Sequence, residues 1–479
     1  MLYEAPRYAP AVRPTLHRLH LDAAAAVVVA ITVLMFAFGS SSVPALHDGG
    51  TRGRWVALGV LLVVAALSAL AREGVPRFWP LPVAIAAFLG VLAILSTLWS
   101  VQPRLSFERG VSFGVLLLAA GLLAYASAGV PARRALLLRG IVGGAVLVAV
   151  AGLLVLAFKS SYAVLWWSPG GPATRFRGLG ENPNTVPLLF SLAAPAAAWL
   201  VVQAESRRER VLWAVAFLLL YGELAATQSR GALVAMAAGL ALVAVLVPAA
   251  RRRRAQHVVG AVALIAIAVV ITSLRFSVGQ GYEATHIPPQ QVPDAVATTS
   301  TSLKHCTSCD LLTFPGRADD LGNPFFTGKF AISNSAVSSS GRLSAWKGAL
   351  HTAAERPFAG FGFGTEDRVF VDRYYFFVGS RPENGFLGFF LQLGVLGLLG
   401  FAGLGLMLLV GLVRVLLRGE PDERSVSVGF AGVVLAGFVA ALTQSYPYSV
   451  GNIAALTLWI AVLGLATAST AREMGSRHG

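Results

Sequence analysis

Charged residues are scarce in this sequence. Only 13% of its 479 residues are charged, whereas 56% are hydrophobic, and the mean hydropathy is +0.69. Soluble globular chains carry about 25% charged residues, so the composition excludes a water-soluble fold of this size. The scarcity of charge indicates a protein whose apolar surface lies in a lipid bilayer.

The alternating pattern of membrane β-barrel strands is also absent. Such strands alternate lipid-facing apolar with lumen-facing polar residues, whereas this chain has long uniform runs rich in Ala, Leu, Val and Gly. A membrane-spanning helix needs roughly 20 apolar residues, and about twelve such runs are present. We therefore predict an all-α polytopic membrane protein. The runs are 21–40, 55–71, 81–99, 110–127, 137–157, 185–203, 211–227, 231–249, 257–274, 385–413, 425–444 and 451–468.

Basic residues predict the orientation of these spans. Arginines gather in every second short loop, and cytoplasmic loops typically carry such an excess. The pattern places both termini in the cytoplasm and explains the net charge of +15. It argues against a nucleic-acid partner, because no soluble domain collects the arginines. The basic loops contain Arg72, Arg77, Arg133, Arg134, Arg139, Arg207, Arg208, Arg210, Arg251 to Arg254, Arg414, Arg418 and Arg424.

One long segment interrupts the series of spans. We predict nine membrane helices in residues 1–274, a large extracytoplasmic loop in residues 275–384, and the last three helices with a cytoplasmic tail in residues 385–479. The loop contains Cys306 and Cys309, which form a short disulfide or remain two thiols. They predict no zinc site, because a second pair of ligands is missing.

The end of this loop has helical periodicity. Apolar residues recur at helical spacing, so we predict an amphipathic helix there. Two interpretations stay open: the helix lies on the outer membrane surface, or it packs on the membrane spans. The "GFGFG" run at 360–364 follows no predicted strand, which argues against nucleotide binding. The periodic residues are Leu343, Trp346, Leu350 and Ala353.

Arginines on the predicted outer side are candidate ligands for phosphate. The planar guanidinium binds phosphate through two parallel hydrogen bonds, and ionisable groups at the membrane usually mark function. Taken singly, each arginine can instead be structural. Glu223 shares a helix face with Arg230 if one helix runs through both residues. The candidates are Arg175, Arg177, Arg230 and Arg342, with Arg381, Glu383 and Asn384 crowded at the start of the late span.

The ordered motifs resemble those of the O-antigen ligase and polymerase family. The blocks are "WSVQP" at 99–103, "RFRGLGENPN" at 175–184, "TQSRGA" at 227–232, "GRLSAWKGAL…ERPFAGFGFGTED" at 341–367 and "PENGFLGFFLQLGVLGLLGF" at 382–401. The resemblance implies a GT-C-like glycosyltransferase in the bacterial inner membrane. It also implies an undecaprenyl-diphosphate-linked glycan donor, a lipid or glycan acceptor, no metal and no cofactor. Arg177, Arg230, Arg342 and, more weakly, Arg175 are then expected to bind the diphosphate.

The sequence departs from the family pattern at one informative position. Family ligases usually carry His-Asn where this chain has Glu383-Asn384, and the resemblance implies that this His is their general base. We expect Glu383 to replace it, with Asn384 as its orienting partner; an inactive relative and a different acceptor are the alternatives. A structural ion pair of Glu383 with Arg381 or Arg342 also stays open. Other functions left open are polysaccharide polymerisation, glycan transfer to protein and, in a different class, membrane transport.

Overall fold

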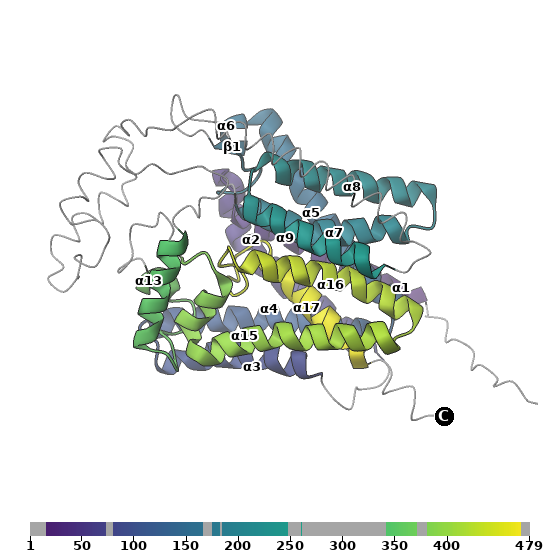
Figure 1. The fold of residues 1–479 in the computed structure, drawn as a ribbon. Helices are drawn as coiled ribbons and strands as arrows, with labels where there is room; N and C mark the ends of the chain where they lie inside the picture. The colour runs from purple at the N-terminus through teal and green to yellow at the C-terminus, as the bar shows by residue number, and fades with distance from the viewer. Residues whose placement is uncertain are drawn as a thin grey trace, which may run out of the picture.

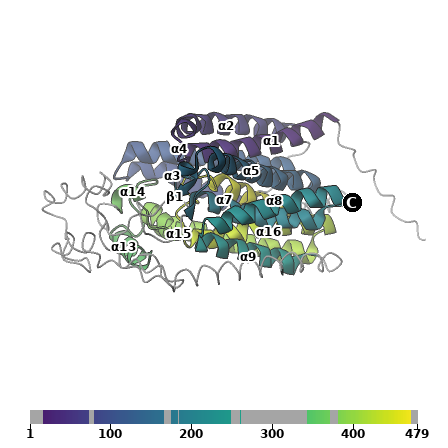
Figure 2. The same cartoon turned by 90° about the horizontal axis from the view of Figure 1, so that it is seen from above.

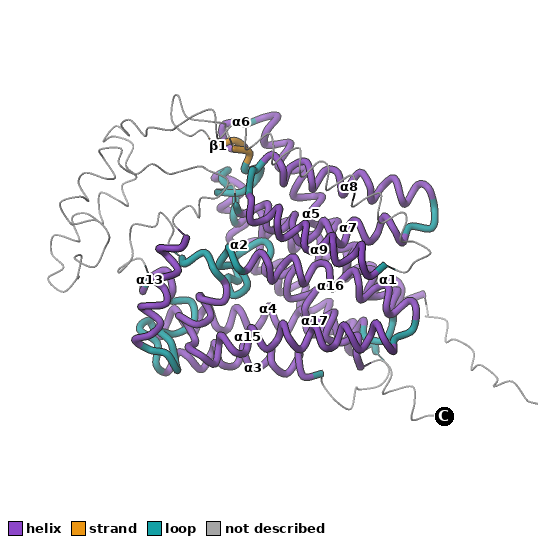
Figure 3. The backbone as a smooth tube through the Cα atoms, viewed as in Figure 1, coloured by secondary structure: helices purple, strands orange, loops and turns teal. Residues whose placement is uncertain are grey.

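The structure is a bundle of long helices that run side by side (Figures 1 and 3). It is a computed structural model and describes residues 16–72, 80–165, 175–182, 184–247, 260, 342–370 and 381–470. The long helices are α1 (Leu16–Gly39), α2 (Pro44–Leu70), α3 (Leu81–Leu95), α4 (Pro103–Ser127), α5 (Pro131–Phe158), α7 (Thr185–Gln203), α8 (Arg207–Ala226), α9 (Arg230–Leu246), α15 (Gly385–Arg418), α16 (Pro421–Ala441) and α17 (Ala455–Ala466).

Short strands, short helices and 3₁₀ turns lie at the ends of the long helices. Strands β1 (Val164–Leu165) and β2 (Arg175–Phe176) form an antiparallel pair, which the sequence analysis did not predict. The helical elements are α6 (Ser160–Ala163), α13 (Arg342–Glu355) and α14 (Glu366–Val369), with 3₁₀ turns at Ser96–Leu98 and Thr467–Thr470.

The helices confirm the predicted fold class. Eight of the described helices are long and apolar enough to cross a membrane, and α9 and α17 are shorter apolar helices. Each predicted run has its helix, except 257–274, which lies outside the described residues apart from Gly260. The total of about twelve spans therefore stays a prediction. Large apolar side chains such as Leu70 and Leu98 are more than four-fifths exposed, as expected for a surface that faces lipid.

Helix α7 forms the centre of the bundle. Within its apolar stretch 94% of the residues are buried, and it packs against α5, α8, α9 and α16. A helix that is apolar on every side is stable only when other helices or lipid surround it. Close packing elsewhere depends on small residues: a Cβ atom on Gly144 of α5 would lie 3.1 Å from the Cα atom of Ala30 in α1.

The two ends of the bundle carry different kinds of contact. We call the end that holds α13 the α13 end and the opposite end, where α1 begins, the Arg134 end; both views show them far apart (Figures 1 and 2). At the Arg134 end the fully buried Arg134 forms an ion pair with Glu423 and donates to the carbonyl of Gly464 at 2.9 Å. Through these two contacts Arg134 joins α5, α16 and α17 at the end of the bundle opposite α13.

The amphipathic helix α13 packs on the bundle through a row of alanines. Ala345, Ala349 and Ala353 are buried against Leu391 of α15 and its neighbours. The predicted apolar residues Leu343 and Leu350 are 57% and 47% exposed. Of the predicted set only Ala353 belongs to this contact, because small alanine side chains allow the closest approach of two helices.

We expect the α13 end to face away from the cytoplasm, because the arginine-rich loops lie at the Arg134 end. In a background with Cys306 and Cys309 replaced by serine, Ser160→Cys places a thiol at an exposed position of the α13 end. Glu205→Cys does the same at the Arg134 end. A membrane-impermeant maleimide should label the first variant in intact cells and the second only after permeabilisation. The reverse pattern would contradict the orientation.

Candidate active site

Glu383 has an unusual backbone conformation. Its φ angle is +52°, in the left-handed region, and among the described residues only Gln228 shares a positive φ without being glycine. Such a conformation costs of order 1–3 kcal/mol for an ordinary residue and clusters at functional sites. Both strained positions lie beside predicted site residues, since Gln228 precedes Arg230 in the turn between α8 and α9.

Asn384 fixes the position of Glu383 by capping α15. Its side-chain oxygen accepts hydrogen bonds from the backbone N–H groups of Phe386 and Leu387 at 3.0 and 3.1 Å. Its amide nitrogen donates to the carbonyl of Leu442 at 3.1 Å, and its own N–H donates to Ser445. The side chain predicted to orient the base or the sugar is thus already engaged, and it holds the chain beside Glu383 against the end of α16.

Helix α15 is broken one-third of the way along by Gly394, whose φ of 65° and ψ of −158° are not helical. A segment of the loop fills the break: Phe361 and Gly362 donate their N–H groups to the carbonyls of Leu391 and Gln392 at 3.0 and 2.9 Å. The "GFGFG" run therefore satisfies carbonyl groups at the break in α15, and the absence of nucleotide binding stays a prediction.

The "WSVQP" block is attached to the same loop. The indole N–H of Trp99 donates to the carbonyl of Ala359 at 2.7 Å, and the N–H of Val101 donates to the carbonyl of Phe361 at 3.1 Å. Arg109 of α4 forms an ion pair with Asp367 at 3.1 Å. Motif blocks that are far apart in the sequence are therefore in direct contact at the α13 end.

The Glu383 carboxyl lies within the electrostatic reach of two arginines. Burial raises the pKa of Glu383 above its usual value, and the charges of Arg342 and Arg381 oppose that rise. Its Oε2 atom and the Nε atom of Arg342 are both buried and have no hydrogen-bond partner among the described residues. A raised pKa suits a carboxylate that has to accept a proton near neutral pH.

Arg230 joins this group from α9. Its charge lies close enough to that of Arg342 for the two to interact, so two like charges face the same region. Arg230 is the first residue of α9, and Gly231 beside it abuts Thr443 at the end of α16. The structure thus brings together Arg230, Arg342 and Glu383, which come from separate motif blocks.

The two arginines of the Arg177 hairpin, which is the β1–β2 pair together with Arg177 directly after it, are placed differently. Arg177 donates to the carbonyls of Tyr162 and Ser161 at 2.7 and 3.1 Å, and more weakly to that of Glu181. Its described contacts are therefore local, and they tie the residue after β2 to α6. Arg175 pairs through its backbone with Leu165 in the β1–β2 pair; the position of its side chain is not described. Diphosphate binding by Arg175 and Arg177 stays a prediction.

Glu223 and Arg230 do not share one helix, contrary to the condition considered above. Helix α8 ends at Ala226 and α9 begins at Arg230 after a tight turn. Glu223 is 5% exposed, and its carboxylate faces Gly152 of α5 and Gly178 in the loop after β2. Both its oxygens lack a hydrogen-bond partner among the described residues.

Sequence analysis did not select Glu366, which is the most deeply buried carboxyl among the described residues at the α13 end. It is 2% exposed, accepts a hydrogen bond from the Tyr448 hydroxyl and forms an ion pair with Arg381 at 3.2 Å. Burial raises its pKa to about 7. The only sequence signal for it was an acidic pair directly after the "GFGFG" run, which equally fits an exposed turn.

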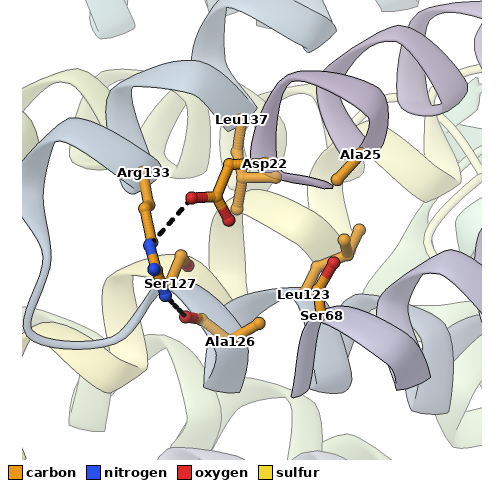
Figure 4. Close-up of a pocket in the computed structure, with 8 residues that line it drawn as sticks. All are labelled: Asp22, Ala25, Ser68, Leu123, Ala126, Ser127, Arg133 and Leu137. Atoms are coloured by element: carbon orange, nitrogen blue, oxygen red, sulfur yellow. Dashed lines mark hydrogen bonds and ion pairs between the residues drawn. The ribbon is translucent and has the colours of Figure 1, made fainter. Parts of the chain in front are cut away.

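A small pocket at the opposite end of the bundle is unrelated to this group (Figure 4). It lies between α1, α2, α4 and α5, and its polar feature is an ion pair of 2.9 Å between Asp22 and Arg133. Arg133 also donates to the carbonyl of Ala126. The pocket has no contact with the motif blocks, so it does not enter the candidate active site.

A comparison with known families bears on the later motif blocks. Residues 214–402 match the family model described as O-Antigen ligase. The predicted resemblance to the O-antigen ligase family is thereby confirmed. No curated protein gives a significant match. The matched segment of the O-antigen ligase type contains Arg230, Arg342, Glu366 and Glu383, and it indicates an enzyme of glycan transfer in a membrane.

Metal binding has no obvious ligand set in the part of the chain that the structure describes. Within these residues no three His, Cys, Asp or Glu side chains gather as a metal site would require. Cys306 and Cys309 lie outside the described residues. The expected independence from metals stays a prediction of the O-antigen ligase resemblance.

Proposed function

We propose that this protein transfers a glycan from an undecaprenyl-diphosphate carrier to an acceptor hydroxyl, on the extracytoplasmic side of the bacterial inner membrane. One observation carries the proposal: Arg230, Arg342 and Glu383 come from separate motif blocks and meet at the α13 end. The match to the O-antigen ligase family supports glycan transfer as the chemistry. The membrane helices support a donor that is itself anchored in lipid.

Arg230 and Arg342 are suited to hold the diphosphate of the carrier. Two like charges close together are unfavourable by themselves, and a diphosphate between them compensates both. Guanidinium groups also stabilise the negative charge that develops on the leaving diphosphate in the transition state. We assign Arg177 a smaller part, because its guanidinium already binds carbonyls of α6.

Glu383 is suited to act as the general base. The acceptor oxygen forms a bond to the anomeric carbon while the bond from that carbon to the diphosphate oxygen breaks. The hydroxyl proton passes to the Glu383 carboxylate and from there to water, and the diphosphate leaves with the electron pair of the broken bond. A single displacement of this kind inverts the configuration at the anomeric carbon. Asn384 and the cap of α15 keep the carboxylate in place.

Replacing an arginine of the pair should weaken carrier binding. Arg230→Ala and Arg342→Ala each remove a charge-assisted contact, worth roughly 1.5–3 kcal/mol, so binding of undecaprenyl diphosphate should fall by about 10-fold to 100-fold. The lysine variants should recover only part of the loss, because an ammonium cannot make two parallel bonds. Affinity is measured with purified protein in detergent by ligand-induced fluorescence change.

Arg104→Ala is the matched control for these variants. Its side chain is 93% exposed on α4, where it forms an i, i+4 ion pair with Glu108 at 2.9 Å. Wild-type affinity in both Arg230→Ala and Arg342→Ala would exclude this pair as the diphosphate site.

Replacing the base should stop transfer without preventing binding. Glu383→Gln keeps the shape of the side chain but cannot accept the proton, so transfer should fall by roughly 10²-fold or more. Transfer is followed in native membranes as undecaprenyl diphosphate released from the carrier-linked glycan, which counts every event regardless of the acceptor. Glu383→His should retain measurable activity with its own pH dependence, since imidazole can also act as a base.

Glu383→Gly separates loss of the base from loss of the fold. Glycine adopts a positive φ at little cost, so this variant should keep or raise the thermal midpoint of unfolding while losing transfer. Wild-type transfer in Glu383→Gln would refute the base assignment and leave Glu383 as a structural ion-pair partner.

A further inference from the structure

Glu366 lies close enough to the proposed base, Glu383, for the two charges to interact. It is the first residue of α14, and the rigid turn before it is attached to both α4 and the break in α15. The Tyr448 hydroxyl, from the loop after α16, donates to its Oε2 atom, while Arg381 approaches its Oε1 atom at 3.2 Å. Both carboxylate oxygens are therefore engaged, and neither is offered to solvent.

Arg381 connects Glu366 to Glu383. Its Nε atom faces Glu366, its Nη1 atom donates to the hydroxyl of Ser449 at 2.6 Å, and its charge acts on the Glu383 carboxyl. The Arg381 guanidinium is thus held by Glu366 and Ser449. It therefore serves two acids at once, Glu366 and Glu383. When Glu366 is ionised, it neutralises much of the positive charge that would otherwise support ionised Glu383.

We infer that Glu366 is a positioning residue that shares Arg381 with Glu383 and thereby sets the lowest pH at which Glu383 works as the base. This inference rests on the proposed function. It assigns Glu366 no contact with the donor or the acceptor.

The environment of Glu366 favours a change in the ionisation of its carboxyl near neutral pH. Burial raises the pKa of Glu366 to about 7; Arg381 and the Tyr448 hydrogen bond oppose the rise. Asp367 and Glu383 add to it by repulsion, although Asp367 is paired with Arg109. Because the two acids interact, the acidic limb of the pH–rate profile belongs to the pair as a whole.

The sign of the coupling gives the test. Glu366→Gln removes a negative charge, so Arg381 acts fully on Glu383, the pKa of Glu383 falls, and the acidic limb of the pH–rate profile should move to lower pH by roughly one unit. Arg381→Met removes the supporting charge and should move the limb to higher pH. Tyr448→Phe favours neutral Glu366, so the limb should move in the same direction as in Glu366→Gln, but less.

The measurement is the release of undecaprenyl diphosphate in native membranes between about pH 5 and pH 9, the range in which perturbed carboxylates titrate. Glu108→Gln is the matched control, because it makes the same chemical change in an exposed ion pair of α4; its profile should coincide with that of the wild type. Opposite shifts in Glu366→Gln and Arg381→Met support the inference, since a merely structural defect lowers the rate at every pH.

Shifts in the same direction, or no shift in either variant, would overturn it. If Glu366→Gln fails to fold, Tyr448→Phe and Arg381→Met still have to shift in opposite directions. Failure of the proposed function looks different: Glu383→Gln then retains wild-type transfer. If Glu383→Gln loses transfer but the pH–rate profiles of Glu366→Gln and Arg381→Met do not shift, only the role of Glu366 is refuted.

Discussion

The α13 end depends on the balance of buried charge around Glu383. A carboxylate removed from water is costly unless cations or hydrogen-bond donors compensate it. Here Arg342 and Arg381 supply the cations, and the N-terminus of α15 supplies a favourable dipole next to it. The compensation is incomplete, because one oxygen of Glu383 has no partner among the described residues. Incomplete compensation keeps the carboxylate basic, which a proton acceptor requires.

The surrounding fold holds these charges in place. The break in α15 at Gly394 is filled by the glycine-rich loop, and that loop is bonded in turn to the block at Trp99 and Val101. Asn384 caps α15 and binds the end of α16. Long-range contacts of this kind fix the side chains on helices instead of on free loops, and such fixed geometry favours transition-state stabilisation.

The sequence was sufficient for the fold class because apolar runs of membrane length have few alternative structures. It also selected Arg230, Arg342 and Glu383, since they stand in or directly beside the motif blocks that resemble the O-antigen ligase family. Helical spacing predicted α13, but it could not show which of its residues contact α15, because spacing alone does not distinguish leucines facing outward from alanines in a close contact. The contact of Arg381 with Glu366 could not be predicted, since it depends on α4, α14, α15 and the loop after α16 meeting in space.

The central claim is that the carrier diphosphate binds between Arg230 and Arg342, with the sugar toward Glu383. A cryo-electron microscopy map of the purified protein with undecaprenyl diphosphate tests this directly. The account predicts diphosphate density within hydrogen-bond distance of both guanidinium groups, at the α13 end. Density at the Arg177 hairpin without contact to Arg230 and Arg342, or density at the Arg134 end, would contradict it.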